Sequence, residues 1–230
     1  MSKPSIYKVA RAVATKDLRI ERHSKVVANQ VLPFAGIVMV LFAFALDNDG
    51  ILQRVAPGLV WLATLFSSII VVQRTFAVES ADNALDALRV AGLPPAGVFL
   101  GKVAALTAQL VLFETVLVIL ALVLYQVSLS VGGAVLMVTT AILASVGLAA
   151  MGALYGGLSV GGRGRETLLP LLLLPAVAPV LIAATRATEA AFGSDGTPLR
   201  EGWAWMGLLG VFGALFLFGG TLGFGALTDE

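Results

Sequence analysis

Long apolar runs separated by short polar segments dominate the pattern of this chain. Six of these runs are long enough, or nearly so, to cross a hydrocarbon core, which takes about 20 helical residues. They cover Val26–Leu46, Val55–Val72, Val103–Tyr125, Val131–Leu158, Leu168–Ala184 and Trp203–Leu227. Sustained alternation of apolar and polar positions, the mark of a membrane barrel, is absent, so the spans are expected to be helices.

Composition supports a membrane protein. Of the 230 residues 58% are apolar and 13% are charged, against roughly 25% charged in a soluble domain. We therefore expect an all-α integral membrane protein with six transmembrane helices in a single domain over residues 1–230. Residues 1–25 would be a cytoplasmic or interfacial segment and residues 26–227 the bundle. Cysteine is absent, which excludes disulfides and thiol chemistry.

The basic residues are distributed unevenly between the two sides of the membrane. With both termini on one side, that side carries 12 of the 15 Lys and Arg residues, seven of them before the first span. The other side has only Arg54, Arg186 and Arg200. Because Lys and Arg near span ends stay cytoplasmic, both termini are expected in the cytoplasm.

The segment from Val78 to Pro95 is polar although long apolar runs flank it. At helical spacing its two faces separate. The apolar face has Val78, Ala81, Ala84, Leu85 and Leu88, and the polar face has Glu79, Asp82, Asn83, Asp86 and Arg89. Gly92, Pro94 and Pro95 would end this helix before the next span. An acidic face gains nothing from anionic lipid, so a protein contact is one interpretation and a solvated link between spans is the other.

The N-terminal segment has the opposite charge. Ile6, Val9, Ala10 and Val13 share one helical face, and Lys8 and Arg11 lie off it. This pattern predicts an interfacial helix beside anionic lipid headgroups, with anchoring as its role.

Polar residues inside the spans are candidates for function. Glu114 lies near the middle of the third span, where a carboxylate costs about 2.5–3.5 kcal/mol and should face the bundle interior. It is either a gate or proton-linked site, with Gln109, Asn29 and Gln30 as candidate partners, or a protonated packing residue. Pro170, Pro175 and Pro179 are expected to break the fifth span, as a gate or as a fixed kink.

Other residue types favour packing or simple solvation. Glycine pairs with small-xxx-small spacing, which lets helices approach closely, are Gly152/Gly156, Gly157/Gly161 and Gly219/Gly223. The one histidine, His23, lies among charges, and Trp203 and Trp205 fit an aromatic belt. No metal-ligand or nucleophile–base pattern appears, so we expect no metal site and no enzyme. The chain also lacks a G-x-x-x-x-G-K-[ST] phosphate loop, so an ATP-driven process would need a separate ATPase.

Three stretches carry a family resemblance. They are "ATKDLRIERHSKVV", the region from "APGLVW" through "DNALDALRVAGLPPAGVFLGKVAA", and "LLPLLLLPAVAPVLIAATRATEAA". Together they resemble the heme exporter protein B (CcmB-type) family, the permease subunit of the cytochrome c maturation ABC transporter. The resemblance covers most of residues 14–192 and is weak in the last span.

The resemblance implies an ABC exporter permease in the bacterial inner membrane. Its coupling helix would contact a cytoplasmic ATPase through Glu79, Asp82, Asn83, Leu85, Asp86 and Leu88. Asn83 stands where family members often have glycine. Further implied partners are a second copy of the chain, heme-handling membrane subunits and a heme chaperone. ATP would bind the partner ATPase, heme would be cargo, and this chain would hold no cofactor and no nucleic acid.

Two alternatives remain open from the residues alone. One is an ABC exporter permease for a lipid, drug or polysaccharide. The other is a self-contained channel or secondary transporter, in which Glu114 would be central and no ATPase would be needed. No convincing pair of inverted halves supports that alternative.

Overall fold

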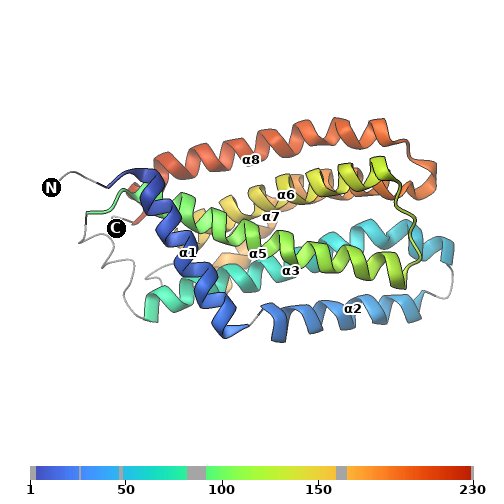
Figure 1. Cartoon of the computed structure of the whole chain (residues 1–230), viewed down its shortest axis with the longest axis horizontal. Helices are drawn as coiled ribbons and strands as arrows, with labels where there is room; N and C mark the ends of the chain where they lie inside the picture. The colour runs from blue at the N-terminus through green and yellow to red at the C-terminus, as the bar shows by residue number, and fades with distance from the viewer. Residues whose placement is uncertain (1–3, 26, 47–48, 82–91, 159–164, 229–230) are drawn as a thin grey trace.

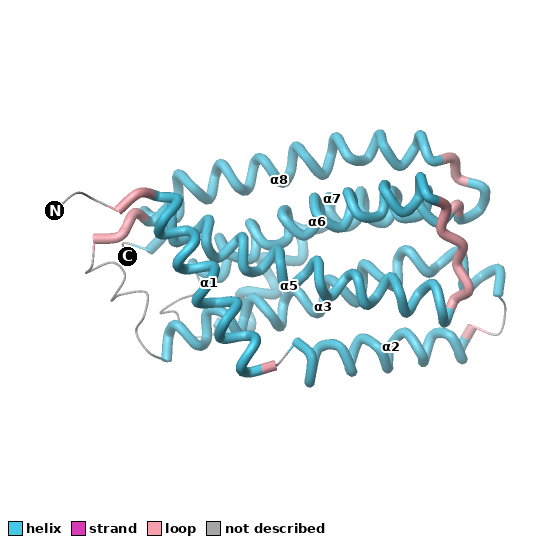
Figure 2. Tube along the Cα trace, in the orientation of Figure 1, coloured by secondary structure: helices cyan, strands magenta, loops and turns pink. Residues whose placement is uncertain are grey.

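Helices run side by side along the long axis of the computed structural model, which describes residues 4–25, 27–46, 49–81, 92–158 and 165–228 (Figure 1). Within these residues there is no strand, and short loops join the helices (Figure 2). The α-helices are α1 (Ile6–Ser24), α2 (Leu32–Ala45), α3 (Asp49–Ala81), α5 (Pro95–Leu124), α6 (Val131–Leu158), α7 (Arg165–Phe192) and α8 (Leu199–Thr228). A π-helical turn at Val27–Val31 and a 3-10 turn at Ser194–Gly196 complete the described elements. The predicted all-α fold is confirmed.

Five helical segments are individually long and apolar enough to cross a membrane. They are Gly50–Ala77, Pro95–Leu124, Val131–Gly157, Leu173–Phe192 and Leu199–Gly225. A sixth span would need two helices together, Ile6–Ser24 and Asn29–Ala45. Only as a pair are they long and apolar enough to cross, and their axes bend by 49° where they meet. The described part of the chain therefore provides five to six spans. Large apolar side chains such as Phe44 and Leu222 lie on the outer surface, 84% and 72% exposed, as lipid contact requires.

The first three spans differ from their predicted bounds. The first is divided between the π-helical turn and the short helix α2, and the second extends past Val72 to Ala81. The third begins at Pro95 rather than Val103. A proline at the first helical position loses no hydrogen bond and has a suitable φ, so Pro95 starts the span instead of separating it from the segment before. By contrast, α6 has the predicted bounds, Val131–Leu158. The helices of the fifth and sixth spans, α7 and α8, extend beyond the predicted Leu168–Ala184 and Trp203–Leu227 at both ends.

The prolines of the fifth span do not interrupt it. α7 continues as one α-helix through Pro170, Pro175 and Pro179, so the prolines do not end the helix, and a kink or gate at these residues stays a prediction. Proline removes one backbone donor, but the hydrogen bonds of the flanking turns remain and neighbouring helices support the segment. In line with this support, α7 packs against α3, α6 and α8.

Both chain termini lie at the same end of the bundle, where α1 crosses the other helices (Figure 1). The end of α3 and the beginning of α5 also lie there. The links from α5 to α6 and from α7 to α8 lie at the opposite end. There Arg54 of α3 forms a 2.7 Å ion pair with Asp195. Successive connections thus alternate between the two ends, as expected for a chain that crosses a membrane repeatedly.

Two of the predicted glycine positions allow α6 to approach α3 closely. A Cβ atom on Gly152 would lie 2.5 Å from Cγ2 of Val72, and one on Gly156 would overlap the ring of Phe76. Gly157 likewise allows α6 to approach α8, because a Cβ atom on it would lie 2.7 Å from Cε2 of Phe224. Its predicted partner Gly161 lies outside the described residues, and Gly219 and Gly223 have open space beside them.

Candidate functional site

Helix α1 lies directly against the first turns of α5. A Cβ atom on Gly101 would lie 2.6 Å from the carbonyl oxygen of Ala10 and 2.6 Å from Cβ of Val13. One on Gly97 would lie 2.9 Å from Cβ of Val9. These glycines permit a close crossing, which covers the apolar face of α1. The N-terminal helix is thus part of the folded bundle as well as amphipathic.

A buried ion pair joins α1 to α5 at this crossing. Oδ2 of Asp17 lies 3.6 Å from Nζ of Lys102, and Oδ1 lies 3.1 Å from Nζ of Lys16. The Lys102 side chain is fully buried, and its ammonium lies 4.7 Å from the centre of the Phe76 ring. The two charges stay inside the structure because they face each other and the ring adds a cation–π contact.

A second contact joins α1 to α3. Nε of Arg74 lies 3.8 Å from Oε2 of Glu21. Phe76 and Arg74 belong to the last turns of α3, and Lys102 belongs to the first turns of α5. Helix α1 is therefore attached to both helices that residues 82–91 connect.

Most of the predicted coupling residues lie outside the described part of the chain. Glu79 is in the last turn of α3, so the segment does not begin as a separate helix at Val78. Asp82, Asn83, Leu85, Asp86 and Leu88 fall within residues 82–91 and are not described. The described chain resumes at Gly92, whose φ of +67° is a backbone conformation that glycine adopts readily.

Glu114 lies in the bundle interior, as the cost of a membrane carboxylate requires. It is fully buried, and its Oε1 accepts a 3.0 Å hydrogen bond from Oγ of Ser145 in α6. Among the described residues no hydrogen-bond donor reaches its Oε2. The candidate partners do not join it: Gln109 is buried without a hydrogen bond to Glu114, and Asn29 and Gln30 are exposed.

An apolar groove of about 370 Å³ opens between α3 and α7. Trp61 lines it and donates a 2.8 Å hydrogen bond to Oγ1 of Thr188. Arg186 and Glu189 form a 2.8 Å ion pair at the groove. The tryptophan therefore links α3 to α7 rather than lying free for a ligand.

The proline and histidine candidates form no shared site. Pro175 is exposed, Pro179 is half-buried, and the Pro170 side chain is not described. Nδ1 of His23 lies 2.7 Å from the carbonyl oxygen of Arg19, on the exposed side of α1. Within the described ranges no group of His, Asp or Glu side chains could hold a metal ion.

The residues that the sequence analysis missed are Asp17, Lys102 and Ser145. Lys102 is one of the 12 basic residues that the sequence assigns to the cytoplasmic side, and no further role was predicted for it. Neither Asp17 nor Ser145 was predicted to have a role. One signal was available: a lysine inside the apolar stretch "GVFLGKVAAL" must reach either the membrane surface or an anion. Which anion it meets depends on the crossing of α1 over α5.

Comparison with known proteins agrees with this architecture. The model of the CcmB protein family matches residues 8–222. Heme exporter protein B of Shigella flexneri is 34% identical over 208 residues, which is 90% of each chain. The Haemophilus influenzae protein of the same name is 32% identical over 184 residues, covering 78% of this chain and 80% of that protein. The one from Paracoccus denitrificans is 31% identical over 189 residues, 80% of this chain and 85% of that protein. A match that takes in α1 and the spans through α8 shows that the chain belongs to the CcmB protein family.

Proposed function

We propose that this chain is the membrane-spanning permease subunit of an ATP-driven heme-export complex that serves cytochrome c maturation. The observation that carries the proposal is the family match over residues 8–222, together with relatives named heme exporter protein B. The multi-span helical bundle supports it. Because the sequence has no phosphate loop, ATP is hydrolysed on a separate ATPase subunit, and this chain is a transporter subunit rather than an enzyme.

The ATPase contacts the segment Glu79–Leu88 on the cytoplasmic side. This segment leads from α3 into α5, and α1 is attached to both helices through the Asp17–Lys102 and Arg74–Glu21 contacts. A displacement of the segment by the ATPase therefore acts on α3 and α5 directly and on α1 through these contacts. An amphipathic segment that enters a groove of its partner is a recurring mode of recognition.

The distribution of basic residues supports the orientation. Both termini lie at the end of the bundle that carries most of the Lys and Arg residues. This end therefore lies on the cytoplasmic side of the bacterial inner membrane. The other partners of the complex are a second copy of this chain, heme-handling membrane subunits and a heme chaperone. Heme is the cargo of the complex, and the partner subunits hold it.

Affinity capture of the chain from native membranes in mild detergent, with mass spectrometry of the bound proteins, tests the proposal. A phosphate-loop ATPase together with a tryptophan-rich heme-handling membrane protein is expected. An ATPase without any heme-handling protein would favour the alternative of an ABC exporter with another cargo. If neither is captured after gentle crosslinking, the proposal fails and the channel or secondary-transporter alternative gains.

The ATPase contact has its own test. Leu85→Lys/Leu88→Lys should abolish capture of the ATPase while the chain still inserts. A matched control is Ala12→Lys/Thr15→Lys, which adds the same charge at two exposed positions of α1. The control should leave ATPase capture intact. Equal capture by both double variants would refute this role for the segment.

A further inference from the structure

The charges of α1 are sorted between two opposite faces. Both of its acidic residues, Asp17 and Glu21, face the bundle and meet basic residues of α5 and α3. Lys8, Arg11 and Arg19 are exposed on the other side, and Lys16 is 41% exposed beside them. The outward face of this helix is thus purely basic. Lys16 also contacts Asp17, at 3.1 Å, so Lys8, Arg11 and Arg19 carry most of the outward charge.

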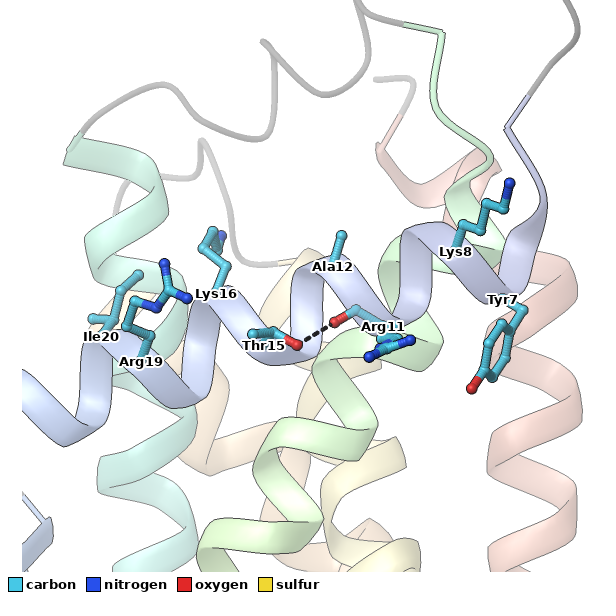
Figure 3. A pocket seen from close by; sticks show the side chains of 8 residues that line it. All are labelled: Tyr7, Lys8, Arg11, Ala12, Thr15, Lys16, Arg19 and Ile20. Atoms are coloured by element: carbon cyan, nitrogen blue, oxygen red, sulfur yellow. Dashed lines mark hydrogen bonds between the residues drawn. The ribbon is translucent and has the colours of Figure 1, made fainter.

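The basic side chains form a row along successive turns of the helix. Figure 3 shows Lys8, Arg11, Lys16 and Arg19 along α1 where it crosses the spans, with Thr15 among them. The Thr15 hydroxyl donates a 2.7 Å hydrogen bond back to the carbonyl oxygen of Arg11, so it occupies a backbone acceptor of its own helix. The row borders a shallow depression of about 680 Å³ on the outer surface of α1.

Apolar side chains flank this row. Tyr7 lies at one end and is 73% exposed, and Ile20 lies at the other end and is 37% exposed. An exposed aromatic and an exposed aliphatic side chain beside a row of cations are typical of a helix in the headgroup region of a membrane.

We propose that the outward face of α1 binds the phosphate groups of anionic phospholipids in the cytoplasmic leaflet. Charge complementarity and the position of the helix carry the inference. α1 crosses the spans near one end of the bundle, beside them rather than beyond them, so its outward face is turned toward the surrounding lipid (Figures 1 and 3). The phospholipid would hold α1 from outside while Asp17 and Glu21 hold it from inside.

The strength of the effect follows from the number of charges. Each Lys or Arg near an anionic membrane surface strengthens association about fivefold, so Arg11 and Arg19 together contribute about 25-fold at most. Screening reduces this at physiological salt, where the Debye length is about 8 Å. We therefore expect a several-fold enrichment of anionic over zwitterionic lipid beside α1, and a smaller enrichment at high salt.

The absence of cysteine makes a local measurement possible. Ala12 is exposed in the middle of the basic row, and Ala12→Cys in the full-length chain gives one labelling position for an environment-sensitive fluorophore. The labelled chain is placed in nanodiscs of phosphatidylcholine and phosphatidylglycerol. Either lipid, in separate samples, bears a nitroxide near its headgroup. The ratio of the two quenching efficiencies reports the enrichment of phosphatidylglycerol at this face.

The expected result is several-fold stronger quenching by labelled phosphatidylglycerol. Arg11→Gln/Arg19→Gln should bring the ratio close to one, and Arg11→Lys/Arg19→Lys should retain it. The matched control Arg54→Gln/Arg200→Gln removes two exposed charges at the opposite end and should leave it unchanged.

Two results would overturn the proposal. One is equal quenching by the two lipids in the unmodified sequence. The other is an enrichment that Arg11→Gln/Arg19→Gln does not change, particularly if that variant loses the captured ATPase instead, which would make this face a protein contact. The proposal does not depend on the cargo, so it stands or falls separately from the proposed function.

Discussion

The buried pair of Asp17 and Lys102 makes the sharpest stability prediction. At 3.6 Å and an effective dielectric constant of about 20, the Coulomb attraction is about 4–5 kcal/mol, which is offset by the desolvation of both groups. Substituting Asp17 by Asn removes the carboxylate that faces the fully buried ammonium of Lys102. Breaking a buried pair in this way costs about 3–5 kcal/mol. The free energy of unfolding should fall by about this amount.

A neighbouring residue provides the matched control. Lys16 also contacts Asp17, at 3.1 Å, but its side chain is 41% exposed. An exposed ion pair contributes about 0–1 kcal/mol, so Lys16→Met should change stability by less than about 1 kcal/mol. The double variant Asp17→Asn/Lys102→Met removes both buried charges. It should be more stable than Asp17→Asn alone.

Unfolding titrations with sodium dodecyl sulfate, followed for each variant in lipid bicelles, measure these differences. The reasoning predicts a large loss for Asp17→Asn, a small one for Lys16→Met and partial recovery in the double variant. If Asp17→Asn is no more harmful than Lys16→Met, the pair does not hold α1 in place. A double variant that is no more stable than Asp17→Asn would equally refute the coupling between the two charges.

Three further substitutions test individual contacts of the bundle, and all can be measured by the same titration. Gly156→Ala should destabilise the protein by about 1–3 kcal/mol because the added methyl group overlaps the ring of Phe76; an unchanged midpoint would contradict the close packing of α6 on α3. Ser145→Ala should cost about 1–3 kcal/mol because it leaves Oε1 of Glu114 without the hydroxyl that donates to it; a neutral effect would show that this bond is not formed in the membrane. Trp61→Phe should cost about 0.5–1.5 kcal/mol because it removes the indole donor to α7 and keeps an aromatic ring; an unchanged midpoint would show that this hydrogen bond contributes nothing to stability.

The sequence predicts the spans well because a membrane imposes one strong constraint, the length of an apolar helix. α6 begins and ends at the predicted residues, and the all-α class follows from the same pattern of apolar runs. Helix ends were harder to predict. Pro95 can stop one helix or start the next, and only the structure shows that it starts α5.

Side-chain partners in the bundle could not be predicted in the same way. The burial of Glu114 follows from its cost in hydrocarbon, but its hydrogen bond to Ser145 depends on the rotation of α6 relative to α5. Similarly, a lysine at position 102 needs an anion, but Asp17 meets it only because two glycines let α1 cross α5 closely. Such contacts depend on how two helices cross, which the periodicity of one chain does not encode.

Cytochrome c maturation in the organism that makes this protein is the most direct test of the central claim. Deleting the gene for this chain should abolish covalent heme attachment to c-type cytochromes, measured by heme staining of separated membrane and periplasmic proteins. The unmodified chain should restore attachment, and the Leu85→Lys/Leu88→Lys variant should not. Normal levels of heme-bearing cytochrome c in the deletion strain would contradict the account.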